Sequence, residues 1–212
     1  MKDLPIYSKQ TVEFVTVGAE YCAFIEKSGE LERVEFVDKC VKLLPLLYLK
    51  AVLLPETEYQ LDEPAEQFVT EEMYEYIRGS ISRLLGAQDD YLEVFIDDMQ
   101  YSENPINSSV SEDLTDIYQD IKDFISVYSM GYEATMNDAL ARVNENFREY
   151  WGQKLVNGMR PLHAIRFGEP IEEENENSAE HSQNSNWLFE NQRNSSIDDL
   201  DADDWSKWDN GK

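Results

Sequence analysis

The sequence predicts an all-α protein, an up-and-down bundle of five or six helices followed by a disordered acidic tail. Two observations lead to this prediction. Apolar residues recur at spacings of three and four over most of the first 168 residues, which is the period of helices with a buried face. After that point the composition becomes polar and acidic, a pattern typical of chains that bury no core. We therefore expect a helical domain over 1–168 and a disordered tail over 169–212.

Charge is distributed unevenly along the 212 residues, which carry a net charge of −26. Residues 1–50 hold 8 acids and 7 bases, and residues 124–170 hold 5 of each. In contrast, residues 56–123 hold 19 acids and 3 bases, and residues 171–212 hold 12 acids and 3 bases. Such a chain repels nucleic-acid phosphates and anionic membranes, so we expect it to contact neither directly. A basic protein partner, a metal ion or no counterpart at all is compatible with this charge.

The sequence favours a cytoplasmic protein. Its N-terminal residues lack the apolar run and cleavage-like site of a signal peptide. The longest apolar run, 43–54, contains Pro45 and Lys50 and is far shorter than a membrane span. Cys22 and Cys40 fall in apolar helical patterns, so we expect buried thiols rather than a disulfide.

The first two expected helices form an antiparallel hairpin. Ser8 can cap a helix that ends at Ser28-Gly29, and a second helix starts near Glu30. Pro45 lies inside the second helix and should kink or interrupt it. The predicted core positions follow the helical period and include Val12, Val15, Val41, Leu44, Tyr48 and Leu49.

Loops and short segments separate the next elements. A polar loop from Pro55 to Gln67 precedes a third helix, which Thr70 can cap and Gly86 can stop. The apolar piece Tyr91–Ile96 is too short for its period to distinguish a helical turn from an extended segment. Residues 101–107 are expected to be a loop.

The helix expected from Ser109 to Gly131 has the clearest start and stop in the chain. Ser109 and Glu112 match a capping box. The apolar residues share one face, and a second stripe at spacings of three and four consists of Asp113, Asp116, Asp120 and Asp123. At about 100° per residue, this stripe lies roughly 120° from the centre of the apolar face. We therefore expect a solvated acidic face that points away from the core.

Beyond this helix, one long helix is expected over about 132–157, with Gly152 permitting a neighbouring helix to approach closely. Arg160-Pro161 could begin a last short helix. His163 is flanked by apolar residues, so we expect a packed or capping histidine rather than a catalyst.

Two functions from different classes are compatible with these patterns. The first is a non-catalytic interaction module without a cofactor, which engages a basic or groove-bearing protein. Its candidate binding residues lie on the acidic helix and among the tail aromatics: Asp113, Asp116, Asp120, Trp205 and Trp208. In a variant of this idea, the acidic surface mimics DNA.

The alternative is a Mg²⁺-dependent hydrolase of a phosphate ester or nucleotide. Asp113, Asp116 and Asp120 would hold the metal, because Mg²⁺ prefers carboxylate oxygens. Arg160 or Lys154 would contact the phosphate. This function requires a surface groove shared with other acids, among them Glu72, Glu75, Asp89, Asp90, Asp97 or Asp98. No catalytic residue is assigned, because the sequence has no Gly-rich phosphate loop, G-x-S-x-G or CxxC motif.

Three segments resemble a bacterial family, the domain of unknown function 5063. They are Leu85-Gly86 through Phe95, Ser108 through Asp123, and Phe147 through His163. The most specific parts are the pattern Asp113-Ile117-Tyr118-Asp120 and the pair Trp151-Gly152. The resemblance covers about residues 8–166, and it implies an all-helical fold with no assigned activity. In relatives the neighbourhood of the Trp-Gly pair looks richer in histidine, where Tyr150 and Lys154 stand here.

Overall fold

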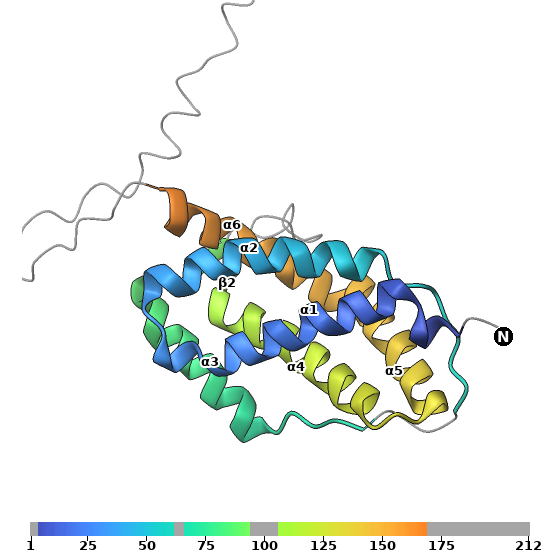
Figure 1. The fold of residues 1–212 in the computed structure, drawn as a ribbon. Coiled ribbons are helices and arrows are strands. Elements are labelled where there is room, and N and C mark those ends of the chain that lie inside the picture. Colours follow the sequence, from blue (N-terminus) through green and yellow to red (C-terminus); the bar gives the residue numbers. More distant parts are fainter. Residues whose placement is uncertain (1–3, 62–65, 94–105, 169–212) are drawn as a thin grey trace, which may run out of the picture. The chain divides into compact units, whose positions relative to one another are not determined.

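The computed structural model describes residues 4–61, 66–93 and 106–168, which form a helical bundle with one short β-hairpin (Figure 1). The predicted all-α class is therefore confirmed. In chain order the elements are η1 (Pro5–Tyr7), α1 (Lys9–Glu26), η2 (Ser28–Glu30), α2 (Arg33–Val52), α3 (Glu71–Leu85), η3 (Gly86–Gln88), β1 (Asp90–Glu93), β2 (Ile106–Ser109), α4 (Val110–Ser129), α5 (Glu133–Asn146), the π-helical segment η4 (Phe147–Trp151) and α6 (Gly152–Phe167). The predicted tail lies outside these residues.

Local sequence signals set several helix ends as predicted. The side chains of Ser8, Thr70 and Ser109 accept hydrogen bonds from backbone N–H groups in the first turns of α1, α3 and α4. Gly86 and Gly131 end α3 and α4 with φ angles of 58° and 78°, a region that favours glycine. These caps satisfy backbone groups that have no partner inside the helix.

Neither helical proline interrupts its helix. α2 continues through Pro45, and α6 continues through Pro161 instead of beginning there. Leu44 and Leu47, one residue before and two residues after Pro45, are fully buried. Such packing offsets the hydrogen bond that proline cannot donate, because tertiary contacts supply most of the stability of a helix in a protein.

The expected long helix over 132–157 is present as a continuous helical run, but it contains a π-helical turn and extends to Phe167. α5 ends at Asn146, and the chain passes through the π-helical turn η4 before α6 begins at Gly152. The Trp151 indole donates to the Val143 carbonyl at 3.1 Å and so connects the wider turn to the end of α5. The close approach at Gly152 comes from Phe147 of this turn and not from a neighbouring helix.

A short hairpin leads into α4. β1 is extended and pairs antiparallel with β2, so that Tyr91 lies opposite Ser108. The predicted loop over 101–107 is thus wrong at its end, because β2 begins at Ile106. The carboxylate of buried Asp89 accepts from the Ser111 N–H at 2.7 Å and the Ser111 hydroxyl at 2.6 Å. This contact fixes the start of α4 to the hairpin.

α4 is the central helix of the bundle, because α1, α3, α5 and α6 all contact it (Figure 1). α2 lies on the outside, packed on α1 and α6. Gly18 permits the approach of α1, since a Cβ there would lie 2.9 Å from Ile121. Val12, Tyr48 and Leu49 were predicted to be core residues but are exposed by 49%, 39% and 52%.

Cys22 and Cys40 are buried free thiols, as predicted. Burial raises the pKa of Cys22 to about 12. Among the described helices, none is both long enough and apolar enough to cross a membrane.

Candidate functional site

The aspartate stripe of α4 does not form a solvated face. Asp113 and Asp116 are buried, with 1% and 7% of their surface exposed, and Asp120 and Asp123 are partly buried. The prediction of an outward acidic face is therefore wrong. Because four helices surround α4, its polar stripe is covered as well as its apolar face.

Asp116 joins three elements that are distant in sequence. Its Oδ1 accepts from the Tyr74 hydroxyl of α3 at 2.7 Å, and its Oδ2 accepts from the Tyr150 hydroxyl of η4 at 2.6 Å. Lys154 of α6 places its Nζ 3.2 Å from the same Oδ2. The carboxylate is thus held by two neutral donors and one cation.

Asp113 shares that lysine. Its Oδ1 lies 3.3 Å from Lys154 Nζ, and its Oδ2 accepts from the Tyr91 hydroxyl of β1. Two buried carboxylates, one lysine and three tyrosines therefore form one polar cluster between α3, α4, the hairpin, η4 and α6. We call it the Lys154 cluster; its members are Tyr74, Tyr91, Asp113, Asp116, Tyr150 and Lys154.

Burial and the neighbouring charges have opposite effects on the pKa of Asp113 and on the pKa of Lys154. Burial raises the pKa of Asp113 to about 6, against the lowering effects of Tyr91 and Lys154. Burial alone would lower the pKa of Lys154, but Asp113 and Asp116 raise it above its ordinary value. Burial and the hydrogen bond to Asp116 raise the pKa of Tyr74 and of Tyr150. At neutral pH we therefore treat Lys154 as charged and Tyr74 and Tyr150 as neutral donors.

The other two aspartates of the stripe hold different segments. Asp123 accepts from the backbone N–H groups of Phe68 and Val69, at 2.7 and 3.0 Å, and so positions the segment that enters α3. Asp120 accepts from the Asn146 amide at 2.5 Å. Burial raises the pKa of Asp120. Each aspartate therefore has a partner from another part of the chain.

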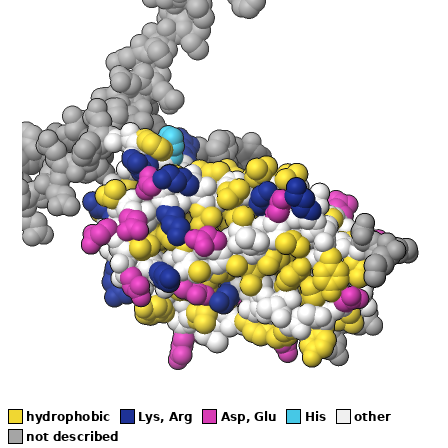
Figure 2. Space-filling model, in the orientation of Figure 1, with side chains coloured by type: hydrophobic (Ala, Val, Ile, Leu, Met, Phe, Trp, Pro, Cys, Tyr) yellow, Lys and Arg dark blue, Asp and Glu magenta, His cyan; other side chains and the backbone are white. Residues whose placement is uncertain are grey.

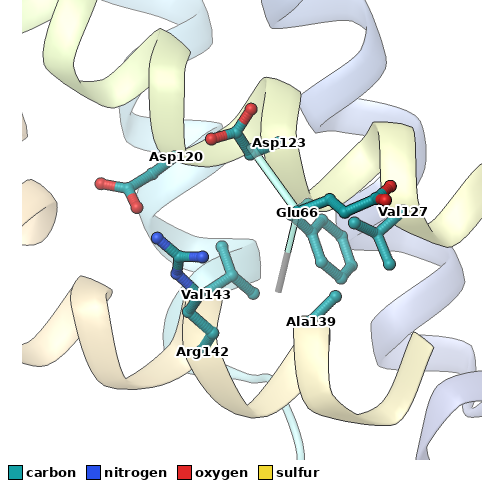
Figure 3. Close-up of a pocket in the computed structure, with 8 residues that line it drawn as sticks. Glu66, Asp120, Asp123, Val127, Ala139, Arg142 and Val143 are labelled. Carbon is teal, nitrogen blue, oxygen red and sulfur yellow. The ribbon is translucent and has the colours of Figure 1, made fainter. Parts of the chain in front are cut away.

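A small cavity lies between the second half of α4 and α5 (Figure 3). Its volume is about 20 Å³, which is room for a single water molecule. Figure 3 shows the Arg142 guanidinium pointing from α5 toward Asp120. A cavity of this size does not accommodate an organic substrate.

The residues predicted for Mg²⁺ binding are paired within the protein. Asp113 and Asp116 meet at Lys154, while Asp120 binds Asn146. Lys154 therefore neutralises the aspartates, whereas the hydrolase alternative assigned it to phosphate. In the described ranges, no group of three or more His, Cys, Asp or Glu side chains is placed to hold a metal ion.

The remaining predicted site residues are dispersed. Asp89 caps α4, and Glu72 and Glu75 are exposed on α3. Arg160 is exposed, and His163 is exposed rather than packed, with its ring 4.8 Å from Phe167. Asp97, Asp98, Trp205 and Trp208 lie outside the described residues.

An open acidic groove, which the sequence did not predict, lies between residues 56–59 and the end of α5. Its volume is about 460 Å³, and its charged lining residues are Glu56, Glu58, Glu145, Glu149 and Arg148. Residues 56–61 are held against α5, where the Asp138 carboxylate accepts from the N–H groups of Gln60 and Leu61 at 2.7 and 2.9 Å. The one sequence feature that pointed to this groove was the high content of acidic residues in the loop after Pro55.

Two of these glutamates are engaged in contacts across the groove. Arg148 lies 2.7 Å from Glu56, and the Tyr59 hydroxyl donates to Glu145 at 2.7 Å. Glu58 and Glu149 are exposed, and within the described residues neither forms an ion pair. The groove therefore presents two unneutralised carboxylates beside an aromatic ring.

Comparison with known proteins gives a family and a fold. Protein BF1032 from Bacteroides fragilis, a structural genomics target with a crystal structure, is 48% identical. The match covers 79% of this chain and 98% of that chain, with a TM-score of 0.70. No curated protein matches the chain. The model of the family described as domain of unknown function DUF5063 matches residues 5–168. The chain therefore belongs to the DUF5063 family, as its aspartate pattern and Trp-Gly pair suggested.

Proposed function

We propose that this protein is a non-catalytic interaction module that binds a basic segment of a partner protein. The observation that supports it is the acidic groove, which presents Glu58 and Glu149 on a chain of net charge −26. Attraction between such a surface and a basic partner accelerates association and selects the partner by charge.

The groove has the chemistry to receive a lysine or arginine side chain. A cation entering it would meet the carboxylates of Glu58 and Glu149, which are not neutralised by the described lysines and arginines. Tyr59 is 54% exposed and offers a ring face beside them. Charge-assisted hydrogen bonds and a cation–π contact are therefore both within reach of one basic residue.

The Lys154 cluster supports a structural role rather than catalysis. A general base or nucleophile must be able to reach its substrate. The oxygens of Asp113 and Asp116 are instead occupied by Tyr91, Tyr74, Tyr150 and Lys154. In the part of the chain that the structure describes, no buried side-chain polar atom lacks a partner.

The groove is tested with a fluorescent octa-arginine peptide, followed by anisotropy at low and at physiological salt. The double variant Glu58→Gln/Glu149→Gln is expected to bind the peptide about three- to tenfold more weakly than the wild type, because two exposed charge contacts are lost. The matched control is Glu30→Gln/Glu32→Gln, which removes the same charge from exposed positions on the α1–α2 connection.

Equal weakening in the two double variants would show that binding depends on net charge alone and would contradict the groove assignment. The tail is tested separately by the double variant Trp205→Ala/Trp208→Ala of the full chain. A partner protein that docks on these two aromatic residues should bind this variant more weakly than the wild type. Unchanged binding by every variant would overturn the interaction proposal.

The hydrolase alternative requires Asp113, Asp116 and Asp120 to bind Mg²⁺. Their contacts with Lys154 and Asn146 lead us to expect no such binding. We expect calorimetry with millimolar Mg²⁺ to give no saturable heat, because binding would have to displace Lys154 from Asp113 and Asp116. Saturable binding that Asp116→Asn abolishes would contradict this expectation and support a metal-dependent enzyme.

A further inference from the structure

The outer face of the α1–α2 hairpin combines exposed uncharged residues from both helices. On α1 they are Val12, Thr16 and Ala19; on α2 they are Leu46 and Leu49, and Leu53 follows at the end of that helix. Leu46, Leu49 and Leu53 are 41%, 52% and 49% exposed and follow the spacing of one helical stripe. An open groove of about 490 Å³ runs between the helices, with Thr16, Ala19, Leu43 and Leu46 in its lining.

Charges on this hairpin are nearly balanced. Residues 9–53 hold 7 acids and 6 bases. Two ion pairs join the helices on either side of the groove, Glu13–Lys50 at 2.8 Å and Glu20–Lys39 at 3.1 Å. Figure 2 shows hydrophobic side chains among charged groups of both signs on this side of the molecule. The hairpin is thus nearly neutral on a chain whose middle region is strongly acidic.

We propose that two copies of the chain associate through this face. A second copy carries the same charge of −26, so it is repelled by every acidic surface and approaches at least cost where the local charge is close to zero. A basic partner is drawn instead to the acidic surface. The exposed leucines supply the apolar area that such an association requires.

The pairing of charges also fits a two-fold arrangement. In a symmetric dimer the same patch lies on both subunits, and each contact occurs twice. With the axis parallel to the helices, α1 of each copy lies over α2 of the other. Glu13 then faces Lys50 of the second copy, and Glu20 faces its Lys39. Small residues of α1, such as Thr16 and Ala19, lie against the leucine stripe of α2.

Sedimentation equilibrium of the full chain tests the association. The wild type is expected at twice its 24.7 kDa mass, and Leu46→Glu/Leu49→Glu should raise the dissociation constant roughly a hundredfold by burying four charges in the interface. The control for an added surface charge is Tyr76→Glu on α3, which is 66% exposed and lies outside this face. Salt should strengthen the dimer by screening repulsion, whereas it should weaken binding of a basic partner.

Oxidative cross-linking tests the arrangement itself. Mixing full-length Thr16→Cys and Leu46→Cys proteins should give a disulfide-linked dimer in higher yield than either variant alone, since the native thiols are buried. A wild-type chain that stays monomeric at all salt concentrations would overturn the proposal. So would a dimer that the leucine variant and the Tyr76 variant affect equally, or cross-linking that does not depend on mixing.

Discussion

Replacing Lys154 by methionine is expected to lower the free energy of unfolding by about 3–5 kcal/mol at pH 8, because it leaves two buried carboxylates without their cation. Asp113 and Asp116 are almost fully buried, and Lys154 is the one cation within 4 Å of either among the described residues. Urea unfolding followed by circular dichroism measures the loss. Lys42→Met is the matched control: Lys42 pairs with Asp38 at the surface, and breaking such a pair costs less than about 1 kcal/mol.

The same variant should lose less stability at pH 5 than at pH 8. Burial raises the pKa of Asp113 from 3.8 to about 6, so at pH 5 its carboxyl is mostly protonated in the folded protein and mostly ionised in the unfolded chain. Protonation therefore favours the folded state, and this contribution disappears as the pH rises through 6. Without Lys154 the pKa of Asp113 rises further, and the neutral carboxyl needs no cation. A loss that is equal at the two pH values, or below about 1 kcal/mol at pH 8, would contradict the assigned role of Lys154.

Replacing Gly152 by alanine is expected to destabilise the protein by about 1–3 kcal/mol, the usual cost of overpacking. A Cβ at this position would lie 2.3 Å from the Phe147 carbonyl oxygen and 2.9 Å from its ring. The carbonyl belongs to the π-helical turn, so it cannot move without disturbing that turn. Thermal and urea unfolding of the purified variant measure the effect.

Gly79→Ala provides the control for that prediction. Gly79 lies within α3, and a Cβ there meets nothing within 4 Å. Alanine should therefore stabilise the chain by about 0.5–1 kcal/mol through its higher helix propensity. Equal stability of Gly152→Ala and the wild type would show that the turn at η4 adapts to a side chain.

The two residues of the Trp-Gly pair thus have separate tasks in one turn. Trp151 is fully buried and bonds the Val143 carbonyl, while Gly152 makes room for the Phe147 carbonyl. Tyr150, which precedes the pair, reaches Asp116 of α4. These contacts give a structural reason why this segment and the aspartate helix carry the family resemblance together.

Residue types and their order were sufficient to predict features that depend on neighbours along the chain. Helical period and composition gave the all-α class, and Ser8, Thr70, Ser109, Gly86 and Gly131 marked helix ends because caps and positive φ angles are local. The buried thiols also followed from local pattern. The π-helical turn and the continuation through both prolines did not, since they depend on packing against other helices.

Only the tertiary structure determined that the aspartates of α4 are buried and which residues they contact. A helical phase gives the direction of a side chain but not the number of neighbours around the helix. One cation and three hydroxyls offset the cost of burying Asp113 and Asp116. They belong to Lys154, Tyr74, Tyr91 and Tyr150, which are 22 to 42 residues away from the aspartates that they contact. The sequence by itself determined a helical, strongly acidic chain of this family. Only the fold determined that its acidic stripe lies inside the bundle, because four helices converge on α4 and supply its partners.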